Sequence, residues 1–346
     1  MCILRINIKE STMLILGIES SCDETGLALY SEDHGLIAHL VNSQIDLFTE
    51  YGGVIPEIAA RDHSAKIIGI LKQLLKQTDH NLEDINLIAY TAGPGLIGSL
   101  MIGETVAKTI ANVLNIELLP INHLEGHILA PGLEEGGLEP PYLCLLVSGG
   151  HTQIIRCDGY GDYKIIGETI DDACGEAFDK VGKLLNLEYP GGPKVSKLAE
   201  NGDSKRFKFP RAMMKDKNLN FSFSGLKTSV LYALEDLNEE DHADVAASFQ
   251  EAVIDALTTK LMWAVQDTKI HKLVCSGGVA SNKLLRDRLK QMAANNNLEV
   301  SYPRMEFCTD NAAMIAYAGF IRKKFKLPTY PTNFARPRWP LGELYD

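Results

Sequence analysis

The chain has 346 residues, of which 45% are hydrophobic and 23% charged, and its formal net charge is −11. The length suggests two domains with a substantial buried core, and the composition is ordinary for a globular protein. No stretch is apolar enough to cross a bilayer, and the acidic balance argues against nucleic-acid binding by most of the surface.

Residues 1–12 precede the first apolar segment. They include Arg5 and Lys9 but have neither the apolar core nor the cleavage site of a signal peptide. Because Met13 begins a new apolar stretch, we interpret residues 1–12 as an N-terminal extension or as the result of a misassigned start codon.

Seven cysteines are scattered along the chain, at positions 2, 22, 144, 157, 174, 275 and 308. Their number is odd, their spacing is irregular and no two form a C-x-x-C pair. This argues against a disulfide framework and against a thiolate zinc site. We therefore expect reduced, mostly buried thiols in a cytoplasmic protein.

The first half of the chain alternates apolar runs with turn-forming residues. The periodicity of the apolar residues and the positions of the turn-forming residues together predict its secondary structure. The expected elements are a hairpin over 14–31, a helix over 64–78, a strand over 86–91 and, after a glycine-rich loop at 92–99, a helix at about 99–113.

The second half repeats this order of strand, small-residue loop and helix. The expected elements are strands over 143–147 and 152–156 around a turn at 148–151, then a strand over 273–275 and a loop at 276–282 before a helix. The repetition predicts two α/β subdomains related by an old duplication, with a cleft between them.

Two glycine-rich turns, Ser148-Gly149-Gly150 and Ser276-Gly277-Gly278, follow predicted strands. Such turns let backbone N–H groups approach phosphate oxygens closely. Neither matches the P-loop pattern, and the dinucleotide spacing at 93–98 contains Pro94 and lacks the acidic residue expected about 20 positions later. Each turn alone is also compatible with a simple tight turn, but several in one cleft indicate nucleotide binding.

His123 and His127 are four residues apart in a run with helical character. This spacing places both imidazoles on one face of a helix, where they can occupy two positions around one zinc or iron ion. Asp310, just before an apolar helix that runs from Ala312, supplies the hard oxygen that would complete a facial ligand set. The alternatives are two structural histidines, and an Asp310 that only caps its helix.

Three further stretches indicate a site rather than a core. Asp23 and Glu24 lie in the hairpin turn that faces the expected cleft and are candidate catalytic residues, although a polar turn needs no function. Asp179 follows a run of acidic and small residues, and could instead pair with Lys183 on a helix surface. Gly192 lies in a rigid turn rich in proline and glycine, where a ligand could approach the backbone.

Positive charge is concentrated in two segments of this acidic chain. Between Asn201 and Val230 there are seven Lys or Arg against two Asp, and between Ile321 and Pro340 there are six against no acidic residue. Such runs are usually solvated faces, but they are also this chain's candidates for contacts to a polyanion.

Together these motifs resemble those of the TsaD family, the tRNA adenosine threonylcarbamoyltransferases once described as O-sialoglycoprotein endopeptidases. The resemblance runs from about Met13 to the end of the chain, and residues 1–12 lie outside it. Its motifs are GIESSCDETG at 17–26, HLEGH at 123–127, LVSGGHT at 146–152, DDACGEAFDK at 171–180, YPGGP at 189–193, FSFSGLKT at 221–228, SGGVASN at 276–282 and TDNAAMIA at 309–316.

The resemblance implies an α/β, actin-like ATPase fold of the ribonuclease H-like (ASKHA) class, with two related α/β lobes and a nucleotide cleft between them. The expected division is an N-terminal extension at 1–12, an N-terminal lobe at 13–120, a C-terminal lobe with helical insertions at 121–325 and a tail at 326–346.

The resemblance also implies one divalent transition metal, usually given as iron(II) with zinc(II) also reported, held by His123, His127 and Asp310. The implied reaction transfers threonylcarbamoyl from threonylcarbamoyl-adenylate to the exocyclic amine of adenosine 37, in tRNAs that read codons starting with A. AMP is released, and the metal polarises the carbamoyl carbonyl. The implied partners are a paralogous TsaB-like subunit and a TsaE-like ATPase. Substrate contacts are expected at Leu146, Val147, Ser148, Gly149, Gly150, Asp179, Gly192 and Asn282.

Two other functions fit parts of the pattern. A zincin metallopeptidase needs Glu directly after the first His, whereas Glu125 comes two residues later, about 200° around the helix from His123. A non-catalytic paralogue, or a kinase-like ATPase on the same fold, does not need the two histidines. The paired histidines therefore favour the transferase.

Overall fold

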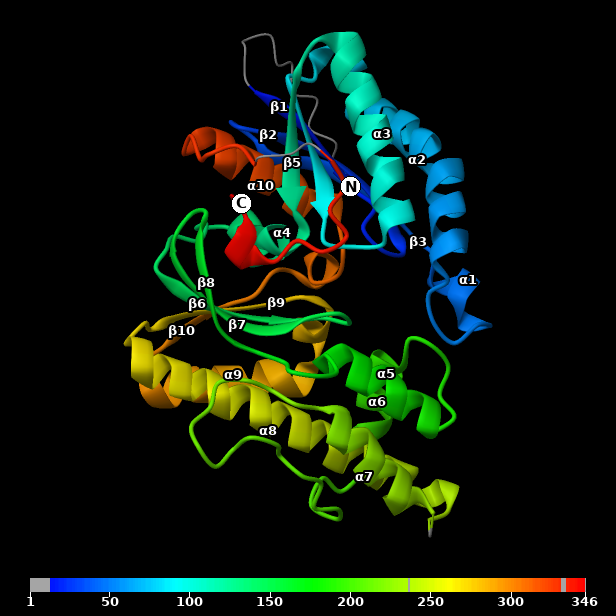
Figure 1. Ribbon diagram of the computed structural model, residues 1–346, viewed down its shortest axis with the longest axis vertical. Coiled ribbons are helices and arrows are strands. Elements are labelled where there is room, and N and C mark those ends of the chain that lie inside the picture. The colour runs from blue at the N-terminus through cyan, green and yellow to red at the C-terminus, as the bar shows by residue number, and fades with distance from the viewer. Residues whose placement is uncertain (1–12, 236, 331–333, 346) are drawn as a thin grey trace.

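The upper lobe in Figure 1 is built on a five-stranded mixed sheet. The computed structural model describes residues 13–235, 237–330 and 334–345. The strands, in the order β3-β2-β1-β4-β5, are β1 (Leu14–Glu19), β2 (Glu24–Ser31), β3 (Gly35–Ser43), β4 (Leu87–Gly93) and β5 (Glu117–Asn122). β2 is antiparallel to β1 and β3, whereas β4 runs parallel to β1 and β5.

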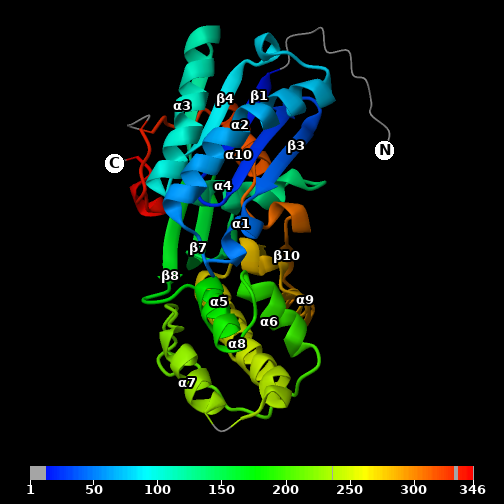
Figure 2. The ribbon, with the colours of Figure 1, turned by 90° about the vertical axis from the view of Figure 1, so that its right-hand side faces the viewer.

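Helices cover both faces of this sheet, which is why its central strands are apolar at successive positions rather than alternately. Leu14 and Leu16 pack with residues of α2, whereas Ile15, between them, packs with residues of α10. Figure 2 shows α2 and α3 on one side of the sheet and α10 on the other. The helices around this lobe are α1 (Ile45–Thr49), α2 (Pro56–Thr78), α3 (Ile97–Leu114) and α10 (Ala312–Lys324).

The lower lobe repeats the same sheet plan. Its strands are β6 (Tyr142–Val147), β7 (Thr152–Gly159), β8 (Asp162–Glu168), β9 (Lys272–Ser276) and β10 (Glu299–Ser301), in the order β10-β9-β6-β7-β8. β7 is antiparallel to β6 and β8, and β9 runs parallel to β6 and β10. The two sheets thus share strand order and direction, and this supports the duplication inferred from the sequence.

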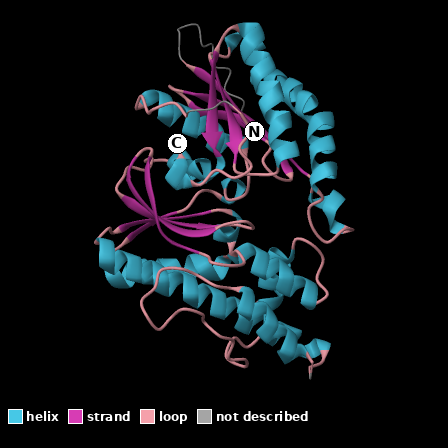
Figure 3. Ribbon diagram, viewed as in Figure 1, coloured by secondary structure: helices cyan, strands magenta, loops and turns pink. Residues whose placement is uncertain are grey.

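Most helices of the lower lobe lie below its sheet (Figure 3). They are α5 (Cys174–Leu184), α6 (Gly191–Ala199), α7 (Ser224–Leu234), α8 (His242–Thr268) and α9 (Lys283–Asn296). Their apolar residues form a cluster with Leu143, Leu145 and Val147 of β6. No helix in the described part of the chain is long and apolar enough to span a membrane.

Two segments near the C-terminus connect the two lobes. α10 follows the lower lobe in sequence but packs against β1, and a side chain at Gly17 would meet the Ala312 carbonyl oxygen at 2.4 Å. The C-terminal segment then places Leu341 and Leu344 in a cluster with Cys157 and Tyr163 of the lower sheet. Both segments hold the lobes against the short helix α4 (His123–Leu129), which lies between the sheets.

The expected elements are confirmed with shifted boundaries. The hairpin over 14–31 is present, and so is the strand–turn–strand unit around 148–151. The helix expected over 64–78 begins earlier, because Pro56 occupies its first turn, where proline is favoured.

Candidate active site and metal centre

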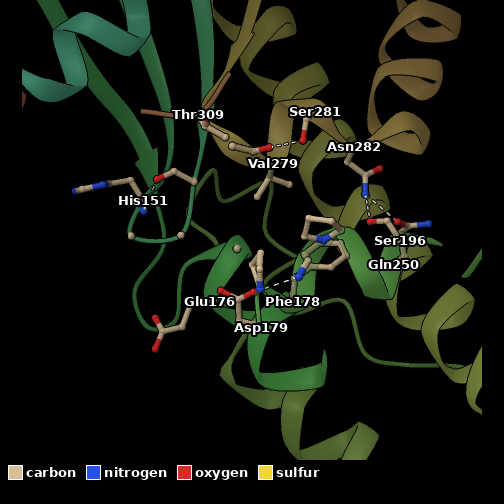
Figure 4. Close-up of a pocket in the computed structure, with 18 of the residues that line it drawn as sticks. His151, Glu176, Phe178, Asp179, Ser196, Gln250, Val279, Ser281, Asn282 and Thr309 are labelled. Carbon is tan, nitrogen blue, oxygen red and sulfur yellow. Dashed lines mark hydrogen bonds between the residues drawn. The ribbon is translucent and has the colours of Figure 1, made fainter. Parts of the chain in front are cut away.

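A cleft of about 1200 Å³ lies between the lobes. The upper lobe contributes the β1–β2 turn and the loop before α3. The lower lobe contributes the β6–β7 turn, the starts of α5 and α6, and the loop before α9 (Figure 4). Of the residues predicted for the site, those lining the cleft are Asp23, Glu24, His123, Ser148, Gly149, Gly150, Asp179, Gly192, Asn282 and Asp310.

The three predicted metal ligands meet at the wall of this cleft, which His123 and Asp310 line, whereas His127 is buried. Asn122 caps α4 by accepting hydrogen bonds from the backbone N–H groups of Leu124 and Glu125, so the helix begins at His123. The rings of His123 and His127 lie 4.7 Å apart, centre to centre. Asp310 Oδ1 lies 3.1 Å from His127 Nε2 and 3.4 Å from His123 Nε2. One ligand atom from each of the three residues lies within 4.8 Å of the others.

The cap of α10 leaves the Asp310 carboxylate available. Asn311, not Asp310, is the N-cap, because its side chain accepts the Met314 N–H at 3.0 Å. The alternative in which Asp310 only caps its helix is therefore wrong. The Asp310 oxygen is directed at both histidines instead.

Glu19 holds the other side of His123. Its Oε2 lies 3.1 Å from His123 Nδ1 and accepts the Thr91 hydroxyl at 2.6 Å, and its Oε1 accepts the Ser21 N–H. The Glu19 side chain is fully buried. Its carboxylate therefore fixes the ring orientation of His123 and leaves Nε2 facing Asp310, as a metal ligand requires.

The two carboxylates that face His123 favour a bound cation or proton at this site. A neutral imidazole has one N–H, yet both ring nitrogens of His123 face carboxylates. Burial alone would lower the pKa of His123, but Asp310 and then Glu19 raise it well above its usual value. Conversely, burial would raise the pKa of Asp310, but the two histidines hold it well below its usual range. Either a proton or a metal ion satisfies this arrangement, and the N,N,O donor set fits zinc or iron.

The β1–β2 turn presents acidic groups to the same cleft. Burial, followed by the charges of Asp23 and Asp310, raises the pKa of Glu24 well above its usual value. Burial and Asp23 also raise the pKa of the Cys22 thiol. Cys22 therefore stays protonated at neutral pH and is a poor nucleophile.

His151, in the β6–β7 turn, also lines the cleft. Burial, and then the positive charges of His123 and His127, lower its pKa to about 4. Its imidazole is therefore neutral at pH 7 and can both donate and accept a hydrogen bond.

The β6–β7 turn exposes glycine backbone to the cleft. A side chain placed at Gly149 or Gly150 would meet no protein atom within 4 Å. Gly175 lies beneath this turn, and a side chain there would meet the Ser148 carbonyl oxygen at 2.7 Å. Leu146 and Val147, by contrast, are fully buried in β6 and do not line the cleft.

Two predicted substrate contacts already have protein partners. Asp179 accepts the N–H groups of Gly191 and Gly192 at 2.8 and 3.1 Å, so it holds the start of α6 rather than forming an ion pair with Lys183. Asn282 caps α9, accepting the N–H of Leu285, and its Nδ2 donates to Ser196 and Gln250 (Figure 4). Both side chains still border the cleft.

Sequence reasoning missed Glu19, Ser21 and Gln250. Glu19 ends an otherwise apolar strand, and a buried carboxylate there needs a charged or hydrogen-bonding partner. That position in the strand was the available signal. Nothing local identifies Ser21 or Gln250, which act through residues far away in the sequence.

The basic segments are partly neutralised. Arg206 pairs with Asp241 and Asp244, and Arg211 pairs with Asp255. The remaining exposed lysines of the first segment are Lys205, Lys208, Lys215 and Lys217, whereas Lys227 is half-buried.

The second segment begins with a buried residue. Arg322 is only 4% exposed and pairs with Glu125, and Lys323 pairs with Glu117. Arg322 is therefore excluded as a phosphate contact.

Comparisons with known proteins indicate a family. Residues 35–317 match the model of the TsaD family, described as tRNA N6-adenosine threonylcarbamoyltransferase. A curated protein of that name from Methylobacillus flagellatus is 50% identical over 336 residues, covering 96% of this chain and 99% of its own.

Among solved structures, full-length HypF in its phosphate- and nucleotide-bound form is similar, with a TM-score of 0.60 and 12% identity over 92% of this chain. The chain spans 47% of that HypF chain. The activator of 2-hydroxyisocaproyl-CoA dehydratase from Clostridium difficile, with bound ADPNP, has a TM-score of 0.51 and 15% identity. That match covers 91% of this chain and 97% of the activator. At these identities the likeness shows the fold alone, an actin-like ATPase fold.

Proposed function

The chain belongs to the TsaD family of tRNA N6-adenosine threonylcarbamoyltransferases and is a transferase that modifies tRNA, and from that premise we propose how the cleft carries out the reaction. The donor is threonylcarbamoyl-adenylate, and the acceptor is the exocyclic amine of adenosine 37 in tRNAs that read codons starting with A. A divalent transition metal at His123, His127 and Asp310 takes part. Iron(II) is the preferred ion, and zinc(II) suits the same donors.

The observation that carries this proposal is the convergence of the three ligand atoms at the cleft wall. Such a metal, when bound, supplies a Lewis acid that polarises the carbamoyl carbonyl. Glu19 orients the His123 ring, and the neutral His151 lies in the same cleft, where it can hydrogen-bond the donor.

The glycine turns hold the donor in this scheme. Gly149 and Gly150 leave their backbone open to the cleft, and this is what close approach to a phosphate or carboxylate requires. Asn282 and Gly192 line the same cleft. Leu146 and Val147 contribute by fixing the strand that carries the turn, since their side chains are buried.

The acceptor amine loses a proton as it attacks the carbamoyl carbon and AMP leaves. Glu24 is the proposed proton acceptor, because it lines the cleft and because burial and the neighbouring Asp23 raise its pKa, which makes its carboxylate more basic than an exposed one. Asp23 lies beside it and contributes negative charge. No serine or cysteine nucleophile is needed, in keeping with the raised pKa of Cys22.

A peptidase function does not suit this site. The Glu125 carboxylate is fully buried and paired with Arg322, so it cannot serve as the base on a metal-bound water. The paired histidines also argue against a non-catalytic paralogue.

We also propose the surroundings in which the enzyme acts. It works in the cytoplasm with a paralogous TsaB-like subunit and a TsaE-like ATPase, and these supply positive surface that this acidic chain lacks. The lobes correspond to 13–120 and 121–325, with α10 returning to the upper lobe and 326–346 forming the tail.

Reconstitution tests the proposal. The purified chain, both partners, threonylcarbamoyl-adenylate and unmodified tRNA should yield threonylcarbamoyladenosine on nucleoside analysis, and Asp310→Asn should not. Equal product from Asp310→Asn would remove the metal triad from the mechanism.

A further inference from the structure

Glu125, between the two histidines of α4, is a buried carboxylate directed away from the cleft. Both of its oxygens lie 3.1 Å from Nη1 of Arg322. The hydroxyl of Tyr163 donates a hydrogen bond to Glu125 Oε1 at 3.1 Å, and the hydroxyl of Tyr330 donates one to Glu125 Oε2. Glu125 is fully buried and Arg322 is 4% exposed. The pair is therefore enclosed and satisfied within the protein.

The partners of Glu125 come from three different segments. Arg322 lies in the last turn of α10, Tyr163 lies in β8 of the lower sheet, and Tyr330 lies in the C-terminal segment. The guanidinium carbon of Arg322 also lies 3.9 Å from the centre of the Tyr330 ring. One carboxylate thus ties α4 to α10, to the lower lobe and to the tail.

α4 and α10 are also the two elements that carry the proposed metal ligands. His123 and His127 are on α4, and Asp310 immediately precedes the N-cap of α10. Arg322 lies roughly 15 Å along α10 from its first residue, from the helical rise per residue. The Glu125–Arg322 contact is therefore an attachment between the two elements that involves none of the ligand atoms.

α4 depends on such attachments for its position. It has only seven residues, and a helix this short has little stability of its own. Gly126 lets α10 approach closely, because a side chain there would meet Ile315 Cδ1 at 2.9 Å and Met314 Cγ at 3.2 Å. Apolar contacts of this kind allow small sliding movements, whereas a charged pair with directional hydrogen bonds favours one register.

We propose that Glu125 and Arg322 are positioning residues of the metal centre, which lock α4 against α10 so that His123, His127 and Asp310 converge. This inference rests on the proposed function, since it assumes a metal at the triad. It gives the central Glu of the HLEGH motif a role that is neither metal ligand nor catalytic base.

Zinc(II) affinity of the full-length chain, measured by competition with a chromophoric chelator, tests the proposal. Glu125→Gln keeps the shape but leaves Arg322 buried without its counter-charge, and should weaken zinc binding at least about tenfold, the range found for groups that orient ligands. Tyr330→Phe removes one hydroxyl and no charge, and should weaken binding about threefold. The double variant Glu125→Gln with Arg322→Met should bind zinc no more weakly than the worse of its two single variants, Glu125→Gln and Arg322→Met. The reason is that both substitutions break the same contact.

A matched control separates position from stability. Leu257, fully buried in the lower-lobe core, can be changed to Ala; this should lower the melting temperature without changing zinc affinity. Circular dichroism confirms that each variant is folded at the assay temperature. If Glu125→Gln does not fold, the zinc affinity of Tyr330→Phe relative to the parent chain tests the proposal instead.

The outcomes separate this inference from the proposed function. If Asp310→Asn loses zinc while Glu125→Gln and Tyr330→Phe bind it as the parent chain does, the positioning role is refuted and the metal centre stands. Zinc binding lowered equally by Leu257→Ala would also refute it. If Asp310→Asn binds zinc as well as the parent chain does, both the metal centre and the positioning role fail.

Discussion

Replacing Gly149 by Val should weaken binding of threonylcarbamoyl-adenylate without disturbing the fold. Gly149 is exposed to the cleft, its φ lies outside the left-handed region, and a side chain there would meet no protein atom within 4 Å. The free energy of unfolding should therefore change by no more than about 0.5 kcal/mol.

The effect on the ligand should be larger. An isopropyl group at this position separates the backbone N–H from any anionic oxygen that it binds. Loss of one hydrogen bond to a charged group costs about 1.5–3 kcal/mol. The dissociation constant for the adenylate should therefore rise at least about tenfold.

Isothermal titration calorimetry with the adenylate measures this change. Gly225→Val is the matched control, because Gly225 on α7 also has open space around it but lies outside the cleft; its affinity should be unchanged. Gly175→Ala is unsuitable, because its side chain would clash with the backbone of Ser148. Affinity of Gly149→Val within twofold of the parent chain would place the ligand elsewhere.

Three further outcomes are expected. Glu24→Gln should lower kcat at least about 100-fold in the transfer assay while leaving zinc affinity intact; activity within twofold would reduce Glu24 to a polar turn residue. His151 has a pKa lowered to about 4, so it contributes stability that is complete above about pH 6.5 and is lost as the pH falls towards 4. His151→Asn should remove up to about 3 kcal/mol of that acid-dependent loss in urea unfolding at several pH values, and an unchanged pH profile would contradict the shift. Charge reversal of the exposed Lys208, Lys215 and Lys217 should weaken tRNA binding and make its salt dependence shallower without altering adenylate affinity. Normal tRNA binding by this triple variant would show that these lysines form only a solvated face.

Much of the fold could be predicted because its strands, turns and helices are each marked by residues close together in the sequence. Apolar runs followed by glycine turns mark both hairpins, and their repetition in the two halves matches the shared strand order of the two sheets. Boundaries were less certain, as the earlier start of α2 at Pro56 shows. The return of α10 to the upper sheet could not be foreseen, because its apolar residues fit either lobe.

The candidate site could be predicted where the type and spacing of the residues indicate their chemistry. The spacing of His123 and His127 predicted a shared helix face, and the need for a hard oxygen ligand suggested Asp310, which lies 183 residues from His127 in sequence. The role of Glu19 was not predictable, since it depends on a ring 104 residues away. Composition likewise identified the basic segments but not that Arg322 is buried against Glu125.

The metal content of the chain tests the central claim most directly. Protein purified without chelators should carry about one transition metal ion per chain by elemental analysis, and His123→Ala with His127→Ala should carry none while keeping its circular dichroism spectrum. Transfer of threonylcarbamoyl to tRNA should be lost together with the metal. Full metal occupancy in the double variant, or full transfer activity without metal, would contradict the assignment of the triad.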